Sequence, residues 1–329
     1  MFLLKMQNTL LVNANALVEN NIIFGPVNSR RFGVSLGIDL SPSSKQCNFD
    51  CLYCELAPMA TVENQTVTVP VKEIMSALKP YLNAKIDVIT LTANGEPTLY
   101  PHLSQLIDEI DSVKNSTETL ILTNSASLVN KTVFDALLKL DQVKLSLDAI
   151  STDVFKKIDR PHESINVNDI VSKVIEFSKI YKGKLFIEIL FVHELNDTKD
   201  EINKLNKTLL EIKAQRIDLG TIDRPPAYSV VGISYKELHT ISMAFDSSLP
   251  IHIASRVHAE PNNAKYTKDE ILNTLDKRPL TLDDINLLFD EETKERLKTL
   301  QNEKKVTLKK VGNLEFLLPT DNFKRKLKK

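Results

Sequence analysis

The chain has 329 residues, which is enough for one large domain and a small second one. Its 42 basic and 43 acidic residues nearly cancel, which excludes a global electrostatic attraction to nucleic acid or to a membrane surface. Residues 265–329 differ, because they contain 16 basic and 12 acidic residues. This end of the chain is therefore the candidate for contact with a polyanion.

The sequence predicts neither a targeting segment nor a membrane segment at its amino-terminal residues. Lys5 and several polar residues interrupt the apolar residues between Met1 and Val18, so neither a signal-peptide core nor a membrane span is expected. We expect residues 1–23 to be an extension, and the protein to be cytoplasmic without membrane contact.

Six short runs rich in Val, Ile and Thr alternate with segments of helical periodicity. The sequence predicts strands at 34–40, 87–93, 119–124, 142–148, 184–192 and 216–222. Helices are predicted at 71–82, 102–113, 132–140, 167–181 and 198–213. Strands that alternate with helices predict parallel βαβ units, arranged either as a closed barrel or as an open doubly wound sheet.

Polar residues on one face of these strands favour the barrel. Polar and apolar residues alternate in 35–39 and again in 144–148. A doubly wound sheet would be apolar on both faces, and a filled barrel would have bulky interior side chains. The pattern therefore predicts an incompletely filled barrel with a cavity, formed by residues 24–253.

A second, smaller domain is predicted after the barrel. An edge strand is expected at 249–253, and Pro261 with two asparagines marks 254–265 as a linker. Helices at 268–275, around Ile285 and at 292–302 precede a hairpin formed by 306–310 and 314–318. This order predicts a winged-helix-like domain at 266–320, followed by a basic tail at 321–329.

Three cysteines carry the clearest chemical signal. Cys47, Cys51 and Cys54 lie in the loop after the first of the six strands, where a barrel exposes its active face. Their number and spacing exclude a disulfide framework and indicate a metal site in a reducing compartment. Iron–sulfur cubes usually have four cysteine ligands, so here one iron would be open or bound by another group. Zinc completed by a histidine such as His102, or three buried thiols, are the alternatives, although structural zinc more often uses cysteine pairs.

Polar residues at the ends of the next strands could join the cysteines. In the loop after the second strand, Gly95 lets the backbone approach a ligand, and Glu96 can accept hydrogen bonds from an ammonium group; a plain turn is the alternative. Asn124 ends the third strand, and Ser146 and Asp148 end the fourth. All three could meet in one cavity, whereas a helix cap is the alternative for each alone.

Two arginines are candidates for substrate binding. Arg160 and Arg224 lie on loops at the presumed active face, and a guanidinium group suits a carboxylate or phosphate; surface ion pairs are the alternative. Arg30 and Arg31 precede the first strand at the opposite rim, where a structural role is expected. His193 could serve as a substrate-side acid or base, or could simply be hydrogen bonded.

The motif Cys47-x-x-x-Cys51-x-x-Cys54, with Tyr53 before the third cysteine, is similar to the cluster motif of the radical S-adenosylmethionine (SAM) superfamily. Within it, the chain resembles a bacterial subgroup related to wyosine-type tRNA-modifying enzymes. Further segments carry this resemblance: 24–31, 35–39, 94–99, 143–148 and 223–226.

The resemblance implies a fold and a set of cofactors. The fold is a partial (β/α)6 barrel of the TIM type, with one 4Fe-4S cluster on the three cysteines and SAM as the second cofactor. Gly95 and Glu96 would bind the methionyl amino group, although Asn94 replaces the first glycine of the family motif. Four further residues would complete the SAM site: Tyr53, Asn124, Ser146 and Asp148.

The resemblance also implies a reaction. An electron from a small donor such as flavodoxin or ferredoxin would cleave SAM to a 5'-deoxyadenosyl radical, which abstracts hydrogen from a substrate, with RNA as a candidate. Wyosine-forming enzymes carry additional cysteines for a second cluster, and this chain has three in total. That particular reaction is therefore not expected.

A different class of function is an iron–sulfur redox-responsive regulator that binds nucleic acid. Glu96 and the polar barrel face favour the enzyme, because a pure sensor would need neither. The last predicted helix mixes Lys294, Arg296 and Lys298 with glutamates, which makes a poor phosphate track. The C-terminal domain is thus a candidate for contact with either tRNA or protein.

Overall fold

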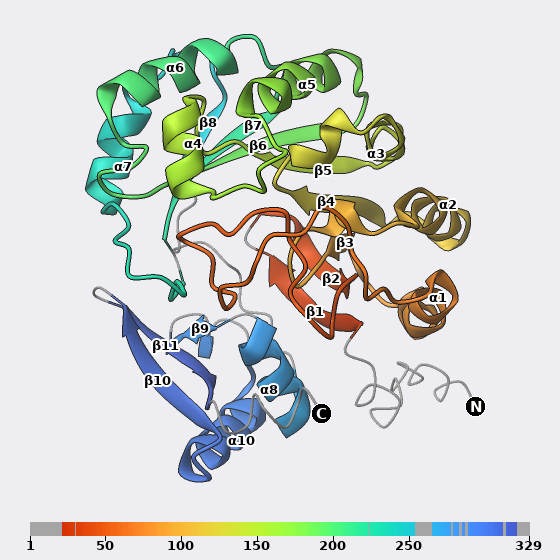
Figure 1. Ribbon diagram of the computed structural model, residues 1–329. Helices are drawn as coiled ribbons and strands as arrows, with labels where there is room; N and C mark the ends of the chain where they lie inside the picture. Colours follow the sequence, from red (N-terminus) through yellow and green to blue (C-terminus); the bar gives the residue numbers. More distant parts are fainter. Residues whose placement is uncertain are drawn as a thin grey trace, which may run out of the picture.

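The computed structural model describes residues 22–29, 31–222, 224–253, 265–277, 279–282, 285–286, 289–311 and 314–320. They form a large α/β unit with an eight-stranded sheet and a small unit with a three-stranded sheet (Figure 1). Several expectations lie outside the described residues: the extension before residue 22, Arg30, most of the linker and the basic tail.

The strands of the large sheet follow one another in chain order. β1 (Ile23–Ser29) pairs antiparallel with β2 (Gly33–Asp39), and every later neighbour is parallel. The parallel strands after β2 are β3 (Val88–Thr92), β4 (Glu118–Thr123), β5 (Gln142–Ser146), β6 (Lys184–Phe191), β7 (Arg216–Thr221) and β8 (Ile251–Ile253). A doubly wound sheet would reverse its order, so this topology agrees with the predicted partial barrel. β8 is the predicted edge strand.

Helices cover the outside of the sheet (Figure 1). They are α1 (Val71–Leu78), α2 (Leu103–Val113), α3 (Lys131–Leu137), α4 (Thr152–Ile158), α5 (Val167–Ile180), α6 (Lys199–Leu209) and α7 (Tyr235–Ser242). Short 3-10 helices are η2 (Lys79–Tyr81), η3 (Pro97–Leu99) and η4 (Ala126–Val129). The five predicted helices are present, whereas β1, α4 and α7 were not expected. β1 contains Pro26, which a strand tolerates at a sheet edge.

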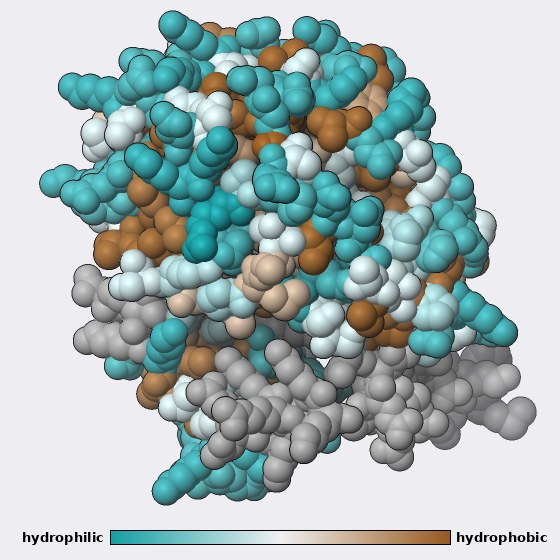
Figure 2. Space-filling view, in the orientation of Figure 1, coloured by the Kyte–Doolittle hydropathy of each residue, from teal (hydrophilic) through white to brown (hydrophobic). Residues whose placement is uncertain are grey.

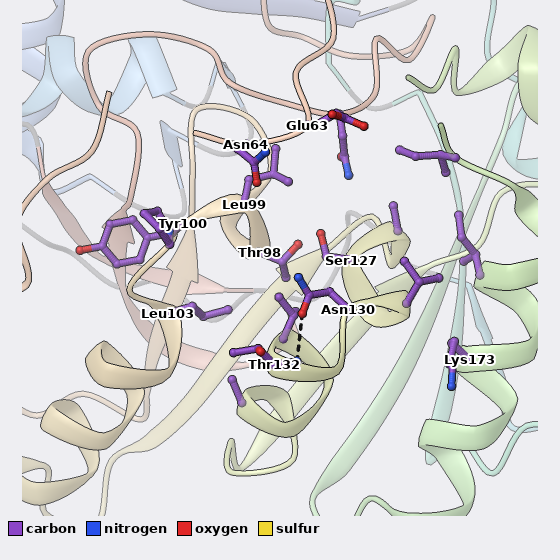
Figure 3. Close-up of a pocket in the computed structure, with 18 of the residues that line it drawn as sticks. Glu63, Asn64, Thr98, Leu99, Tyr100, Leu103, Ser127, Asn130, Thr132 and Lys173 are labelled. Atoms are coloured by element: carbon purple, nitrogen blue, oxygen red, sulfur yellow. Dashed lines mark hydrogen bonds between the residues drawn. The ribbon is translucent and has the colours of Figure 1, made fainter. Parts of the chain in front are cut away.

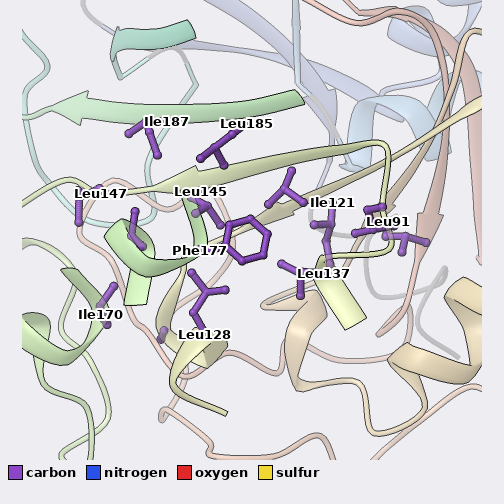
Figure 4. Close-up of a cluster of buried hydrophobic side chains, with 14 of the residues drawn as sticks. Leu91, Ile121, Leu128, Leu137, Leu145, Leu147, Ile170, Phe177, Leu185 and Ile187 are labelled. Atoms are coloured by element: carbon purple, nitrogen blue, oxygen red, sulfur yellow. The ribbon is translucent and has the colours of Figure 1, made fainter. Parts of the chain in front are cut away.

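The outer face of the sheet packs against α3 and α5. Phe177 of α5 is fully buried beside Leu145 and Ile187 of the sheet (Figure 4). Its ring meets Phe134 edge to face at 5.3 Å and stacks on Tyr181 at 4.8 Å. Burying one such side chain contributes roughly 1.5–3 kcal/mol, so this layer anchors the strands that position the site.

Part of the inner face of the sheet is exposed. The inward-facing residues Thr92, Leu122, Ser146, Glu188 and Leu190 keep partial exposure, whereas others, such as Ser35, Thr90 and Lys144, are buried. The alternation of polar and apolar residues is present as the barrel prediction requires, and the cavity stays a prediction.

The small unit has its own core, which includes Leu275, Phe289 and Leu317. Its elements are α8 (Lys268–Lys277), β9 (Leu280–Thr281), α10 (Glu291–Asn302), β10 (Val306–Val311) and β11 (Leu314–Pro319). The two outer helices and the hairpin agree with the predicted elements, while β9 was not expected. The predicted middle helix falls largely outside the described residues, so the winged-helix assignment stays a prediction. Tyr266 links the units by donating to the carbonyl of Pro26 at 3.2 Å.

Hydrophilic side chains dominate the face seen in Figure 2, where apolar ones form separate small patches. Within the described part of the chain, no helix has the length and apolar character needed to cross a membrane. The described elements turn most of their apolar side chains into the two cores.

Candidate functional site

The loop between β2 and α1 brings Cys47, Cys51 and Cys54 together at the carboxyl end of the sheet. Burial raises the pKa of each thiol, that of Cys47 to about 12. The charges of Cys47 and Cys54 raise the pKa of Cys51 further, which places the three sulfurs in one neighbourhood.

Two hydrogen-bond donors face the sulfur of Cys47. The Phe49 amide donates to Cys47 Sγ at 3.4 Å, and Asn124 Nδ2 lies 3.9 Å from the same sulfur. Donors to sulfur are typical of iron–sulfur centres, where they stabilise bound thiolates. Among the described residues, no three His, Cys, Asp or Glu side chains are grouped as ligands of a single metal ion. In a cube, each thiolate binds a different iron, and three thiols on one loop fit such a cluster.

Lys45 places a buried positive charge beside the loop. Its Nζ lies 3.8 Å from Cys54 Sγ and 3.6 Å from Asp50 Oδ1, and its side chain is 8% exposed. This charge counteracts the effect of burial on the pKa values of Cys54 and Cys47. The sequence did not identify Lys45 as a site residue. It lies outside the cysteine motif, and no sequence pattern marks a single lysine as a neighbour of these cysteines.

Gly95 allows the loop after β3 to touch the cysteine loop. Its φ is +137°, and a Cβ would lie 2.0 Å from the carbonyl oxygen of Gln46. The Glu96 amide donates to that same carbonyl at 3.0 Å. In this structure, the lack of a side chain at Gly95 therefore allows two loops of the site to come into contact.

Glu96 is buried between the ends of β3 and β4. Its Oε1 accepts from Thr98 Oγ1 at 2.6 Å and from Thr123 Oγ1 at 2.5 Å, and its Oε2 accepts from the Asn124 amide at 2.9 Å. Burial raises the pKa of Glu96, while these hydrogen bonds oppose the rise. In the described residues, Oε2 has only the Asn124 partner, so it can accept from one more donor.

Four predicted site residues line one small cavity under the cysteine loop: Tyr53, Asn124, Ser146 and Asp148. The Tyr53 hydroxyl donates to Asp148, whose Oδ1 also accepts from the Leu190 amide at 2.7 Å. Burial raises the pKa of Asp148 to about 7. Asp159 lines the same cavity next to Cys51 and was missed, because it follows the unexpected helix α4.

The structure pairs both candidate substrate-binding arginines with acidic residues of the cysteine loop. Arg160 lies 3.4 Å from Asp50 and stacks over the Tyr228 ring at 4.7 Å, while Tyr228 donates to Asp50 at 2.5 Å. Arg224 forms an ion pair with Glu55. These contacts match the surface ion-pair alternative, and they brace the loop.

Two other candidates lie apart from the cysteine loop. His193 is half exposed and hydrogen bonded to Asp197 at 3.2 Å. Arg31 reaches into the barrel from the turn between β1 and β2 and binds Glu188 at 2.5 Å and Asp218 at 3.1 Å. This structural contact agrees with the expectation for Arg31.

A groove of about 820 Å³ runs beside the site, between the amino ends of α2, α3 and α5 (Figure 3). Asn48, which follows Cys47, lines it and accepts a hydrogen bond from Asn124 at 2.7 Å. Uncharged polar side chains dominate the walls, among them Asn64, Thr98, Ser127, Asn130 and Thr132. Residues from three separate βα units line this groove. No local sequence motif could therefore have predicted it.

Residues 41–205 match the sequence model of the family described as the Radical SAM superfamily. The chain belongs to this superfamily. As a radical SAM enzyme, it uses a 4Fe-4S cluster and SAM, and the cysteine loop contains the residues that fit such a cluster.

Relatives and solved structures agree with this family. A UPF0026 protein of Helicobacter pylori strain J99 is 41% identical over 299 residues, which cover 90% of this chain and 96% of that protein. A radical SAM methyltransferase from Sphaerobacter thermophilus shares the fold with a TM-score of 0.53 and 14% identity, over 67% of this chain and 66% of its own. A TYW1 structure with a lysine-pyruvate adduct bound has a TM-score of 0.51 and 17% identity, over 69% of this chain and 76% of its own. At such identities, the solved structures show the fold alone.

Proposed function

We propose that this radical SAM enzyme abstracts a hydrogen atom from a substrate held in the open interior of the barrel. The carrying observation is the position of the three cysteines at the carboxyl end of the parallel strands, beside inward-facing residues such as Ser146 and Leu190 that keep partial exposure. When bound, the reduced cluster and SAM supply methionine and a 5'-deoxyadenosyl radical, with the electron drawn from a small donor such as flavodoxin or ferredoxin.

The residues around the loop would hold SAM in place. Cys47, Cys51 and Cys54 would hold the cluster, and its remaining iron would be open to the amino and carboxylate groups of SAM. Glu96 Oε2 has room to accept from the SAM amino group, next to the backbone of Gly95. Three groups of the small cavity would face the ribose and the carboxylate: Asn124, Ser146 and Asp148. Tyr53 orients Asp148 through its hydroxyl.

The loop after β7 would keep water away from the reacting atoms. The Ala227 amide donates to the Cys54 carbonyl at 2.8 Å, and Arg224 and Tyr228 bind acidic residues of the cysteine loop. These contacts fasten one side of the barrel mouth to the other. Exclusion of water protects a reactive intermediate from side reactions.

RNA is the substrate class suggested by the resemblance, and the C-terminal unit gives it little electrostatic support. On α10, Lys294, Arg296 and Lys298 each pair with a glutamate, at 2.8, 2.5 and 2.6 Å. Paired cations make weak phosphate contacts. Steep loss of tRNA affinity with rising salt would support RNA, whereas absent or salt-independent binding would remove it. The comparisons give the regulator alternative no support.

Reductive SAM cleavage tests the proposed function. The reconstituted protein, incubated anaerobically with SAM and dithionite, should form 5'-deoxyadenosine and methionine in equal amounts. Cys51→Ala should abolish both products, because one cluster ligand is missing. A fully loaded wild-type cluster that forms neither product would contradict the proposal.

A further inference from the structure

The barrel interior ends in a set of charged side chains, which we call the floor cluster: Arg31, Lys144, Glu188, Arg216, Asp218 and His252. Lys144 Nζ lies 2.5 Å from Glu188 Oε2, and Arg31 bridges Glu188 and Asp218. Arg216 and His252 bind Asp218 at 2.9 and 3.0 Å. These ion pairs thus connect the strands β5 to β8 with the turn between β1 and β2.

Positive charge exceeds negative charge in the floor cluster. Arg31, Lys144 and Arg216 are opposed by only two carboxylates, and His252 adds further positive charge when protonated. The side chains of Lys144 and Asp218 are buried, at 9% and 1% exposure, whereas those of Arg31 and Arg216 are 24% and 25% exposed, and Arg216 also stacks over the Phe186 ring. Charge removed from water must be balanced by an opposite charge, so an excess cation here favours an additional anion.

Unused hydrogen-bond donors point to the same conclusion. The Lys144 ammonium has three N–H donors, and within the described residues it meets one acceptor, Glu188. Arg31 has five donors, and its contacts with Glu188 and Asp218 both use NH1. A carboxylate or phosphate oxygen is the group that such donors bind most strongly.

The floor cluster faces the same interior as the proposed SAM site. Lys144, Ser146 and Asp148 share the inward face of β5 and its continuation, because side chains alternate along a strand. Four residues of strand span about 13 Å, and Ser146 pairs with Glu188 at the level between Lys144 and Asp148. The side chains of Glu188 and Arg31 are 23% and 24% exposed, so solvent reaches the floor cluster.

We propose that the floor cluster binds the carboxylate or phosphate group of a small substrate, with Lys144 and Arg31 as the donors. Burial lowers the pKa of Lys144, and a bound anion would oppose this effect by adding a counter-charge. The inference rests on the proposed function only for the position of the substrate beneath SAM.

Anion binding can be measured without turnover. Reconstituted protein with SAM is titrated with acetate and with inorganic phosphate at constant ionic strength, with chloride as the reference, by calorimetry and by thermal melting. One anion should bind saturably to the wild type; acetate would identify a carboxylate site, and phosphate a phosphate site. Lys144→Met should weaken this binding at least about tenfold, the value of one charge-assisted hydrogen bond.

Control variants separate binding from folding. Lys184→Met should bind like the wild type, because Lys184 pairs with Glu118 at 2.6 Å on the exposed start of β6. Glu188→Gln should bind more tightly, because it removes the competing carboxylate, and a folding defect would not produce this opposite change. The floor site is refuted if neither anion binds the wild type, or if Lys144→Met binds equally well. SAM cleavage without anion binding would refute the floor site alone, and anion binding without cleavage would refute the proposed function alone.

Discussion

At the residue scale, the surroundings of each sulfur determine how the loop can hold a cluster. Cys47 meets a backbone amide and the Asn124 side chain, whereas Cys54 meets the Lys45 ammonium. Hydrogen bonds to sulfur and local net charge both set the reduction potential of an iron–sulfur centre. Among charged groups, Lys45 acts most strongly on Cys54, and its side chain is almost fully buried.

Lys45→Met should therefore lower the reduction potential of the cluster. Reduction adds negative charge, which the adjacent ammonium stabilises, and a shift on the order of 60 mV would correspond to a tenfold change for one electron. A potentiometric titration followed by EPR measures this value. Lys45→Arg should stay close to the wild type, and an unchanged potential in Lys45→Met would show that the charge does not reach the cluster.

Gly95→Ala should disrupt the same site through its backbone. The new Cβ would lie 2.0 Å from the Gln46 carbonyl at a φ of +137°, so we expect a loss of about 1–3 kcal/mol in unfolding free energy and reduced iron content. Gly220→Ala is the matched control, because its Cβ would meet only one atom, at 3.9 Å. Equal stability and iron content in both variants would contradict this account.

At the element scale, regular strands and helices were predictable, whereas the loops that complete the site were not. The strands β2 to β7 follow apolar runs of local periodicity, so the sequence alone locates them. β1 was missed because Gly25 and Pro26 break its pattern, and the short helix α4 was not assigned from the sequence.

In the site, too, residues within short sequence motifs were predictable, whereas contacts between residues far apart in the sequence were not. The cysteine motif and Glu96 are visible as local motifs. Two partners of Asp50, by contrast, are Arg160 and Tyr228, which lie more than one hundred residues further along the chain. Such pairs depend on tertiary structure, so no sequence pattern reveals them.

Tyr228→Phe tests whether contacts between the loop after β7 and the cysteine loop protect the cluster. It removes a hydrogen bond to the buried Asp50, so the loop should loosen and the cluster should lose its visible absorbance in air several-fold faster. Tyr181→Phe, which removes a hydrogen bond to the Leu140 carbonyl just before β5, at the other end of the sheet, should decay like the wild type. Equal decay rates in the wild type and both variants would show that this contact between the two loops does not shield the cluster.

At the scale of the whole molecule, ion pairs across the floor cluster join the two sides of an open barrel. Arg31 comes from the first edge of the sheet, and Glu188 and Asp218 come from β6 and β7. Burial would raise the pKa of Glu188, but the charges of Lys144 and Arg31 outweigh it and lower this pKa from 4.5 to about 2. The pairs should therefore contribute stability that depends on pH.

The sign of this dependence follows from the lowered pKa of Glu188. The contribution is fully present above pH 4.5 and is lost as pH falls toward 2, and it amounts to on the order of 3 kcal/mol. Urea unfolding of the cluster-free protein between pH 6 and pH 2.5 measures it. Glu188→Gln should be less stable at pH 6 and should show a shallower loss on acidification; an identical slope would contradict the role of Glu188.

The central claim is that three cysteines hold one cube and leave one iron open to SAM. EPR spectra of the reduced, fully reconstituted protein, recorded with and without SAM, test it most directly. The account predicts one 4Fe-4S cluster per chain whose signal changes on addition of SAM, and no such cluster signal in Cys51→Ala. A fully loaded cluster whose spectrum is unchanged by saturating SAM would contradict the claim.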